Sequence, residues 1–398
     1  MMPMRTLRSM LASAAFVGLA AAPAFALDGA DLVAKFNAAS AANGTTITYD
    51  GADVDGDTLT LSNVILKTAA GPGRDLKIGE VTLEGIEEYE DGSYYVETVS
   101  LPDVNVSETE GSVSVKDIAL GGLSIPANPA GGTIDDILLY ESASTGPVSV
   151  TAKGKQVFAL EGVDANLTRQ ESDTGFDFDA TLKGLKADLS DVEDAKAKDA
   201  IQKLGLTNLA GEITMKGSWE IASGNISLGE FALDFANVGR LALAFDISGY
   251  TLEFMKSVQE AMKAQEANPN KEEANQALGL SMMGLMQQLT FNGASIRFDD
   301  ASITKRVLDY LGKEQGVSGD QLAQSLKGLI PVMMAQLNVP ELQNQVSAAA
   351  NTYLDQPKSL TITAKPDKPV PFPMIVGAAM GAPNTMPSVL GVKVTAND

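Results

Sequence analysis

The stretch Ala180-Thr-Leu182-Lys-Gly-Leu185-Lys-Ala187 carries the pattern that decides the fold of this chain. Two apolar residues alternate, two polar or turn-forming residues interrupt, and two more apolar residues alternate. Residues two apart share a face of a strand, so both pairs reach one core only if the inserted residues form a bulge or bend. The same spacing recurs at Ile118/Leu120/Leu123/Ile125, Val99/Leu101/Val104/Val106 and Ile226/Leu228/Phe231/Leu233.

The inserted residues are of types that favour a bend. Glycine is frequent among them and reaches the left-handed backbone region without steric cost. The inserts are Gly79-Glu80, Pro102-Asp103, Gly121-Gly122, Glu161-Gly162, Lys183-Gly184 and Gly229-Glu230. Their separation is not constant, so solenoids and propellers are not supported. We expect an α+β fold: a long curved, mostly antiparallel sheet, as an open groove or a flattened barrel, with a helical C-terminal region packed on it.

Turn signals separate the predicted strands of the N-terminal two thirds. The predicted hairpin turns are Asp55-Gly56, Asp91-Gly92, Glu110-Gly111 and Asp173-Thr-Gly175. A charged segment at residues 190–205 interrupts the strands, with acidic residues first and lysines last, as the helix dipole prefers. It predicts one surface helix closed by Gly205.

Residues 1–26 have the pattern of a secretory signal peptide. Arg5 and Arg8 precede an apolar segment, and Ala24-Phe25-Ala26 provides the small-residue cleavage site. The apolar part is shorter than the roughly 20 residues of a membrane span, which disfavours the alternative of an uncleaved anchor. The sequence predicts a periplasmic or secreted protein without a transmembrane segment after cleavage behind Ala26.

The 398 residues include no His and no Cys. Their absence excludes thiol and Ser–His nucleophiles, His-ligated zinc sites and disulfides. Asp50, Asp53, Asp55 and Asp57 invite a calcium interpretation, but their spacing does not fit an EF-hand loop. We therefore interpret them as a solvated turn and predict no catalytic residue, no metal site and no cofactor.

Negative charge is concentrated in one part of the chain, whose formal charge is −22. Residues 27–249 hold 37 acidic and 15 basic side chains, whereas residues 250–398 hold 14 and 12. The shift predicts an acidic β-rich domain at 27–249 and a helical region with returning strands and a Pro-rich apolar tail at 250–398. Such acidity argues against nucleic acid and anionic lipid headgroups as partners.

Apolar periodicity predicts helices at 252–267, 271–289, from Ile303 to before Gly316, after Ser318, and from Pro340. Pro331 should kink or split the fourth of these. The tail carries a predicted strand at 359–365 and a final strand at 391–395. Between them, an uncharged Pro-rich segment is interpreted as an apolar cap on the sheet or as a mobile lid.

Methionines mark the uncharged segments of the helical region and the tail. Met suits irregular cores and promiscuous apolar surfaces equally, so core packing and ligand contact remain open alternatives. The candidate hydrophobic-ligand contacts are Met282, Met283, Met286, Met333, Met334, Met374 and Met380.

Two stretches carry a resemblance to known proteins. They are the passage Ile296-Arg-Phe298-Asp299-Asp300-Ala-Ser302-Ile303 through Gly316, and the tail Pro357-Lys-Ser-Leu-Thr-Ile-Thr-Ala-Lys-Pro366 with Leu390-Gly-Val-Lys-Val-Thr. Both resemble an uncharacterised exported family of Gram-negative, alphaproteobacterial type. The β-rich half loosely resembles AsmA-type envelope proteins, and that resemblance implies a long curved sheet forming a groove for lipid.

Three functions follow from these observations. The first is a non-enzymatic periplasmic binding protein that holds a lipid or other hydrophobic molecule in an apolar groove. The second is an envelope structural or protein-interaction module with a filled core. The third is a glycan-acting enzyme that uses carboxylates, which leave no local sequence signature; the 6% aromatic content is a poor supply of sugar platforms.

Overall fold

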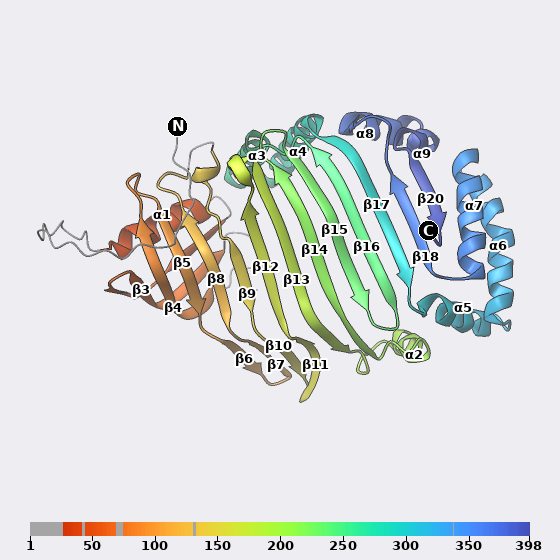
Figure 1. Cartoon of the computed structure of the whole chain (residues 1–398), viewed down its shortest axis with the longest axis horizontal. Coiled ribbons are helices and arrows are strands. Elements are labelled where there is room, and N and C mark those ends of the chain that lie inside the picture. The colour runs from red at the N-terminus through yellow and green to blue at the C-terminus, as the bar shows by residue number, and fades with distance from the viewer. Residues whose placement is uncertain (1–26, 42–43, 69–74, 130–132, 337) are drawn as a thin grey trace, which may run out of the picture.

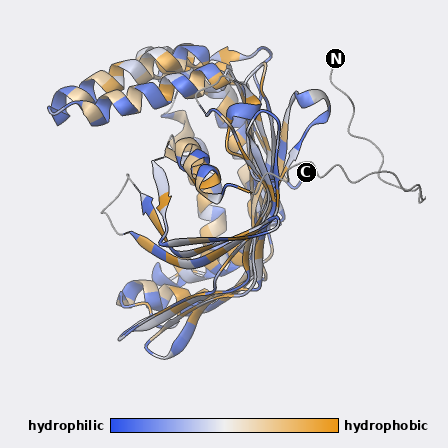
Figure 2. Ribbon diagram, turned by 90° about the vertical axis from the view of Figure 1, so that its left-hand side faces the viewer, coloured by the Kyte–Doolittle hydropathy of each residue, from blue (hydrophilic) through white to orange (hydrophobic). Residues whose placement is uncertain are grey.

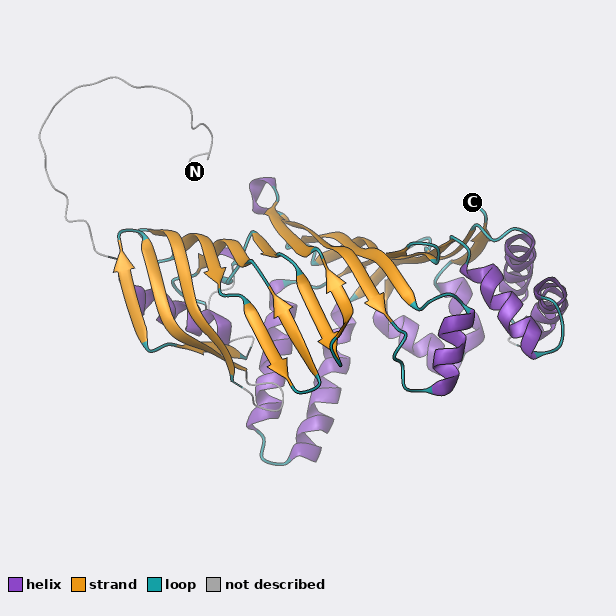
Figure 3. Cartoon of the chain, turned by 90° about the horizontal axis from the view of Figure 1, so that it is seen from below, coloured by secondary structure: helices purple, strands orange, loops and turns teal. Residues whose placement is uncertain are grey.

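The computed structural model of the protein describes residues 27–41, 44–68, 75–129, 133–336 and 338–398. Across these residues, twenty strands form one antiparallel sheet. The long helices lie on one side of the sheet, and the sheet curves toward that side (Figures 1, 2 and 3). The predicted α+β fold is confirmed, with the sheet open rather than closed into a flattened barrel. The predicted signal peptide lies outside the described residues.

The main run of strands pairs side by side in the order β3, β4, β5, β8, β9, β12, β13, β14, β15, β16, β17, β18 and β20. At one end β1 and β2 both pair with β3, and near the other end β19 pairs with β17. The bounds are β1 Thr45–Thr48, β2 Gly51–Asp55, β3 Thr58–Thr68, β4 Leu76–Glu88, β5 Tyr94–Leu101, β8 Ile118–Ile125, β9 Ser142–Thr145, β12 Gly162–Arg169, β13 Gly175–Asp188, β14 Asn208–Glu220, β15 Asn225–Phe235, β16 Gly239–Ser248, β17 Thr290–Asp300, β18 Ser359–Ala364, β19 Val370–Pro371 and β20 Val392–Ala396.

Four further strands pair with one another in a small extension of the sheet, below the main run in Figure 1. They are β6 (Val104–Glu108), β7 (Gly111–Val115), β10 (Val148–Ala152) and β11 (Lys155–Leu160). They pair in the order β6, β7, β10, β11, and β11 then joins β13 beside the end of β12. In the chain, β6 continues β5, β8 continues β7, β10 continues β9, and β12 continues β11.

Two of the four breaks between these strand pairs coincide with predicted bends, and the breaks at 116–117 and 146–147 were not predicted. Pro102-Asp103 separates β5 from β6, and Glu161 separates β11 from β12. On β13 the ladder shifts between Leu182 and Leu185, where Gly184 has φ +61°. Glu161 N donates to Lys183 O at 2.9 Å, which joins the bends of β12 and β13. The inserts at Pro102-Asp103, Glu161 and Lys183-Gly184 therefore lie on one bend line from β5 to β13, whereas Gly121 and Glu230 lie elsewhere, opposite Thr98 and Lys216.

A buried core lies at the N-terminal end, where α1 (Gly29–Ser40) packs on the sheet. Asp28 caps this helix by accepting from the backbone N–H groups of Ala30 and Asp31. Leu32 and Val33 face strands β3, β4, β5 and β8, whose inward residues are also buried. The buried strand residues are Leu59, Leu61, Val64, Val81, Leu83, Ile86, Tyr94, Val96, Val99, Leu123 and Ile125.

The predicted helices form, with boundaries set by local caps. Thr251 and Asn270 cap the helices that follow them, and Ser318 with Gln321 makes the predicted capping box. The helices are α2 Ala195–Lys203, α3 Leu252–Ala267, α4 Lys271–Leu285, α5 Ile303–Glu314, α6 Gly319–Ala335, α7 Pro340–Asp355, α8 Phe372–Gly381 and α9 Met386–Val389, with the short 3₁₀ turns η2 Ile134–Asp136, η3 Glu171–Asp173, η4 Met286–Gln288 and η5 Pro383–Thr385.

Two details of the helical region follow from its prolines. Of the two alternatives for Pro331, a split is excluded, because α6 continues through it to Ala335. The segment predicted to be an apolar cap or a mobile lid contains a helix, α8; Pro373 stands in its first turn, where a missing N–H costs nothing.

The predicted domain boundary near Gly249 falls between β16 and α3, and β16 pairs with β17 on its far side. The sheet continues through this point, and the division into two domains stays a prediction.

Candidate functional site

One line of directly paired residues crosses the whole main run of the sheet, and every member of it is apolar. Directly opposite residues of antiparallel strands share a face, so the line lies on a single side. We call it the central row. In sheet order it consists of Val54, Leu59, Leu83, Val99, Leu120, Ala143, Ala165, Ala180, Met215, Phe231, Leu243, Ile296, Ile362 and Val394.

Three further rows extend this apolar surface from β13 to the β18–β20 end. The first is Leu182, Ile213, Leu233, Leu241, Phe298, Leu360 and Ala396. The second is Phe178, Gly217, Leu228, Phe245, Ala294, Ala364 and Val392, and the third is Phe176, Trp219, Ile226, Ile247, Phe291 and Val370. These three rows and the central row between β13 and β20 are the open face.

Exposure changes along the central row. Leu59, Leu83 and Val99 under α1 are only 0%, 5% and 6% exposed. On the open face Ile296 is 47% exposed and Ile362 41%. The helices of the C-terminal region stand along the margins of this part of the sheet and leave its middle accessible (Figure 1). The apolar surface is therefore closed at one end and open at the other.

A chain of aromatic rings joins the open face to α3. The Phe176 and Trp219 rings stack at 6.2 Å between centroids, and Tyr250 lies 6.4 Å from Trp219 and 5.2 Å from Phe254. Trp219 Nε1 also donates to the Tyr250 carbonyl oxygen at 2.9 Å. Phe254 is buried, so these contacts fix the start of the α3–α4 hairpin at the margin of the open face.

The opposite side of the same strands is polar. Arg240 pairs with Glu230 at 2.6 Å, and Arg297 pairs with Asp299 at 2.8 Å. The hydrogen bond from Arg240 lowers the pKa of the Glu230 carboxyl. This side meets solvent, as the predicted one-sided alternation requires.

The methionines selected from the sequence lie around the open face rather than in its rows. Met283, Met333, Met374 and Met380 are exposed, whereas Met282, Met286 and Met334 are half-buried. The structure brings η4, which contains Met286, against α8, which contains Met374 and Met380, whereas Met333 and Met334 belong to α6, which packs on α7. The apolar spacing pattern of the sequence contains several row residues, among them Ala180, Leu182 and Phe231. It did not mark them as ligand contacts, because their alignment into rows depends on the register of distant strands.

A hollow of about 920 Å³ lies beside β8, the loop before β9, and β12. Its lining includes Tyr95, Tyr140 and Arg169. Arg169 already pairs with Asp135 and Asp173, each at 2.8 Å. Its positive charge is therefore largely neutralised within the chain.

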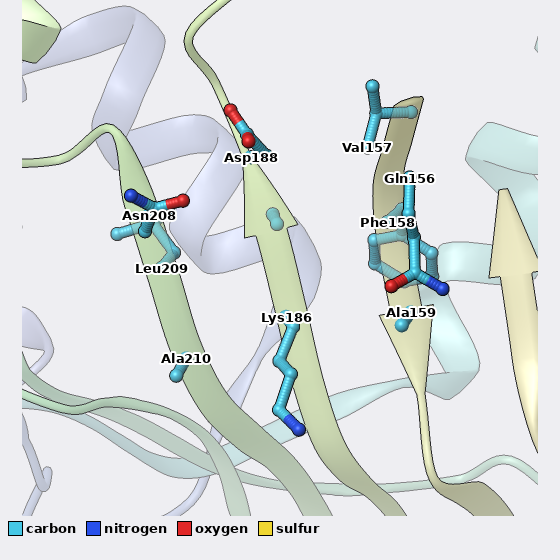
Figure 4. A pocket seen from close by; sticks show the side chains of 10 residues that line it. Gln156, Val157, Phe158, Ala159, Lys186, Asp188, Asn208, Leu209 and Ala210 are labelled. Carbon is cyan, nitrogen blue, oxygen red and sulfur yellow. The ribbon is translucent and has the colours of Figure 1, made fainter. Parts of the chain in front are cut away.

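A smaller pocket of about 350 Å³ lies between β11, β13 and β14 (Figure 4). β11 and β13 pair only at Phe158↔Ala187 and Ala159↔Lys186. The pocket marks the place where this short ladder stops, and both polar and apolar side chains line it.

A titratable cluster at the N-terminal end is structural. Hydrogen bonds from Lys35 and from the Tyr94 hydroxyl, the latter at 2.8 Å, lower the pKa of the Asp31 carboxyl. Burial and the Asp31 carboxylate raise the pKa of Tyr94. The cluster ties α1 to β5. Among the described residues, no group of three or more acidic side chains is arranged to hold a metal ion.

Comparisons with known proteins concern the C-terminal part. A family described as an uncharacterized protein matches residues 232–397, from within β15 to the end of β20. No curated protein matches the chain. In the described part of the chain, no helix is both long enough and apolar enough to cross a bilayer.

Proposed function

We propose that this chain is a non-enzymatic periplasmic binding protein that holds a lipid or other hydrophobic molecule on its open face. The observation that carries the proposal is the exposure of the row residues Phe245, Ile296 and Ile362, which are 39%, 47% and 41% exposed within a continuous apolar surface. Export rests on the signal-peptide pattern of residues 1–26.

The dimensions of the open face suit an acyl lipid. Seven strands from β13 to β20 at a spacing of about 4.8 Å make it roughly 29 Å across. The hydrocarbon core of a bilayer is about 30 Å thick and contains two leaflets, so one acyl chain spans about half of that distance and fits across the strands. Contiguous apolar surfaces of more than a few hundred Å² on soluble proteins mark interaction sites.

The chemistry of the lining supports binding rather than turnover. Every residue of the rows between β13 and β20 is apolar or glycine. Such a surface offers no general acid, base or nucleophile. The curved sheet also agrees with the loose AsmA-type resemblance, whose groove implies lipid as the bound molecule.

An envelope interaction module is the second candidate, and the filled core under α1 favours it. If that function is correct, crosslinking in the periplasm should recover a reproducible protein partner through the acidic β-rich region. Failure to recover one would count against it.

The first proposal is tested by native mass spectrometry of protein purified without detergent. We expect lipid adducts, and displacement of a bound fluorescent fatty acyl probe by added lipid. Protein that carries no adduct and binds no probe would overturn the proposal.

A further inference from the structure

Helix α8 has a composition that contradicts its exposure. Its sequence, Phe372-Pro-Met-Ile-Val-Gly-Ala-Ala-Met-Gly381, contains no polar side chain, yet none of its residues is buried. Met374 is 59% exposed and Met380 is 84% exposed. A helix that is apolar all round is normally buried in a protein core or a membrane, so α8 lacks the cover that its composition calls for.

The surface around α8 shares this character. Phe372 N donates to Leu289 O at 3.1 Å, which joins the start of α8 to the residue after η4. On the preceding helix α4, Leu280 is 70% exposed and Met283 62%. No charged residue occurs in 274–290 or in 369–392. We call these two segments the uncharged rim; both lie along the upper margin of the sheet in Figure 1.

The residues next to the second rim segment are mostly positively charged in a strongly acidic protein, whereas Glu272 and Glu273 directly precede the first segment. Lys365 and Lys368 precede α8 and Lys393 follows α9, all exposed, with Asp367 as the one acidic neighbour between Lys365 and Lys368. Lysines beside an apolar interfacial helix complement lipid phosphates while the apolar side chains enter the acyl boundary.

The composition of the rim favours a bilayer over a protein partner as its cover. Protein interfaces are enriched in aromatic residues, Met and Arg. The rim is rich in Met but contains one aromatic residue, Phe372, and no Arg. Methionine adapts to variable apolar surfaces of either kind, so the scarcity of aromatic residues and the lack of Arg favour the bilayer.

The rim also connects directly to the open face. β19, which leads into α8, pairs with β17 at Phe291↔Val370, and both residues belong to the open face. An acyl chain could thus pass from a bilayer to the open face without crossing a charged residue.

From these observations we infer that the uncharged rim docks the protein, in the plane of the interface, on the surface of a phospholipid bilayer. This inference deepens the proposed function and rests on it, because the rim gives the open face access to membrane lipid.

The test is flotation of the exported chain, beginning at Leu27, with vesicles of phosphatidylcholine. The key variant carries Met374→Glu and Met380→Glu, which place two charges on α8. The matched control is Val106→Glu, since Val106 is a 51% exposed apolar residue on the distant strand β6. Circular dichroism and thermal melting verify that both variants fold. We expect the original chain and the control to float, and the α8 variant to float roughly tenfold less.

Three results would overturn the inference. The original chain does not float, or the α8 variant floats equally well, or the original chain forms a dimer that the α8 variant does not form while neither binds vesicles. The last result would assign α8 to a contact between two copies.

Binding of a monomeric fluorescent fatty acyl probe separates this inference from the proposed function. The α8 variant should retain probe binding, because its open face is unchanged. If the original chain binds the probe but does not float, membrane docking by the rim is rejected and the proposed binding function is retained. If it floats but does not bind the probe, membrane docking is supported and the proposed binding function is rejected.

Discussion

The two ends of the central row differ in what covers them. At Leu59 and Leu83 the row lies under α1 and is almost inaccessible, whereas at Ile296 and Ile362 it meets solvent. The residue types and the strand geometry are the same at both ends. The same apolar row therefore runs along the whole sheet. Where a helix covers the row it forms a core, and where no helix covers it the row is an exposed surface.

The difference has an energetic meaning. Complete burial of a large aliphatic side chain stabilises a fold by about 1.5–3 kcal/mol relative to exposure. The closed end obtains this stabilisation from its own helix. The open end lacks it in the isolated chain, and a bound apolar molecule would supply it. Apolar residues of the closed end should therefore matter for folding, and those of the open face for binding.

The largest expected effect concerns the closed end. Leu59→Ala should lower the free energy of unfolding by about 3–5 kcal/mol, because Leu59 is fully buried and leaves a cavity. Ile296→Ala, in the same row, should cost below about 1 kcal/mol, since that side chain is already half in water. Denaturant unfolding of both variants measures the contrast, and equal losses would contradict it.

The second effect concerns binding at the open face. Ile362→Lys should weaken binding of a fatty acyl probe by roughly tenfold or more, because burying the new charge under a lipid is costly. Thr363→Lys is the control, as the adjacent residue points to the opposite side of β18. Fluorescence titration distinguishes them; similar affinities would show that binding does not use this face.

The bend line provides a third, smaller effect. Gly184 has φ +61° and a Cβ there would lie 2.3 Å from the Glu161 side chain, so Gly184→Ala should destabilise by about 1–2 kcal/mol. Gly229 belongs to an equivalent insert but has its nearest atom at 3.7 Å and no left-handed φ, so Gly229→Ala should be nearly neutral. Thermal unfolding of the pair measures the difference. Equal destabilisation would mean that the bend does not depend on the glycine conformation.

The smallest effect concerns the attachment of α1. Since Lys35 and Tyr94 lower the pKa of Asp31 below its ordinary 3.8, the stability that Asp31 contributes is present above that value and is lost as the pH falls through the folded-state pKa. The contribution should not exceed about 1 kcal/mol, since the pair is partly exposed.

Asp31→Asn should therefore be less stable than the original chain at pH 7 and equally stable at about pH 2. Unfolding measured at both pH values tests the sign. A difference that grows toward low pH would contradict the role assigned to Asp31.

Much of the fold could be predicted, because its signals are local. The insert Lys183-Gly184 predicts a bend in β13 whichever strand pairs with it. The Ser318–Gln321 capping box likewise sets the start of α6 without reference to tertiary contacts. The effect of Pro331 could not be fixed from the sequence, because a helix held by neighbouring packing can tolerate a proline; its carbonyl oxygen here accepts a hydrogen bond from Gln343 Nε2.

The binding surface was harder to predict. Met215, Phe231 and Leu243 align through the ladders of β14, β15 and β16. The register of these ladders shifts between Lys216 and Gly217 and between Leu228 and Phe231. Each shift changes the partner of every later residue, and single-sequence patterns do not fix it. The methionines could be selected from the composition of the uncharged segments, whereas the rows can be recognised only when the strand pairing is known.

The central claim, that the open face holds a hydrophobic molecule, is tested most directly by photo-crosslinking. A photoreactive amino acid replaces Ile362 in one variant and Thr363 in another, and each is irradiated in the exported protein before purification. We predict lipid adducts at position 362 and few or none at 363, read by mass spectrometry. Equal labelling at the two positions, or labelling of protein alone at 362, would contradict the account.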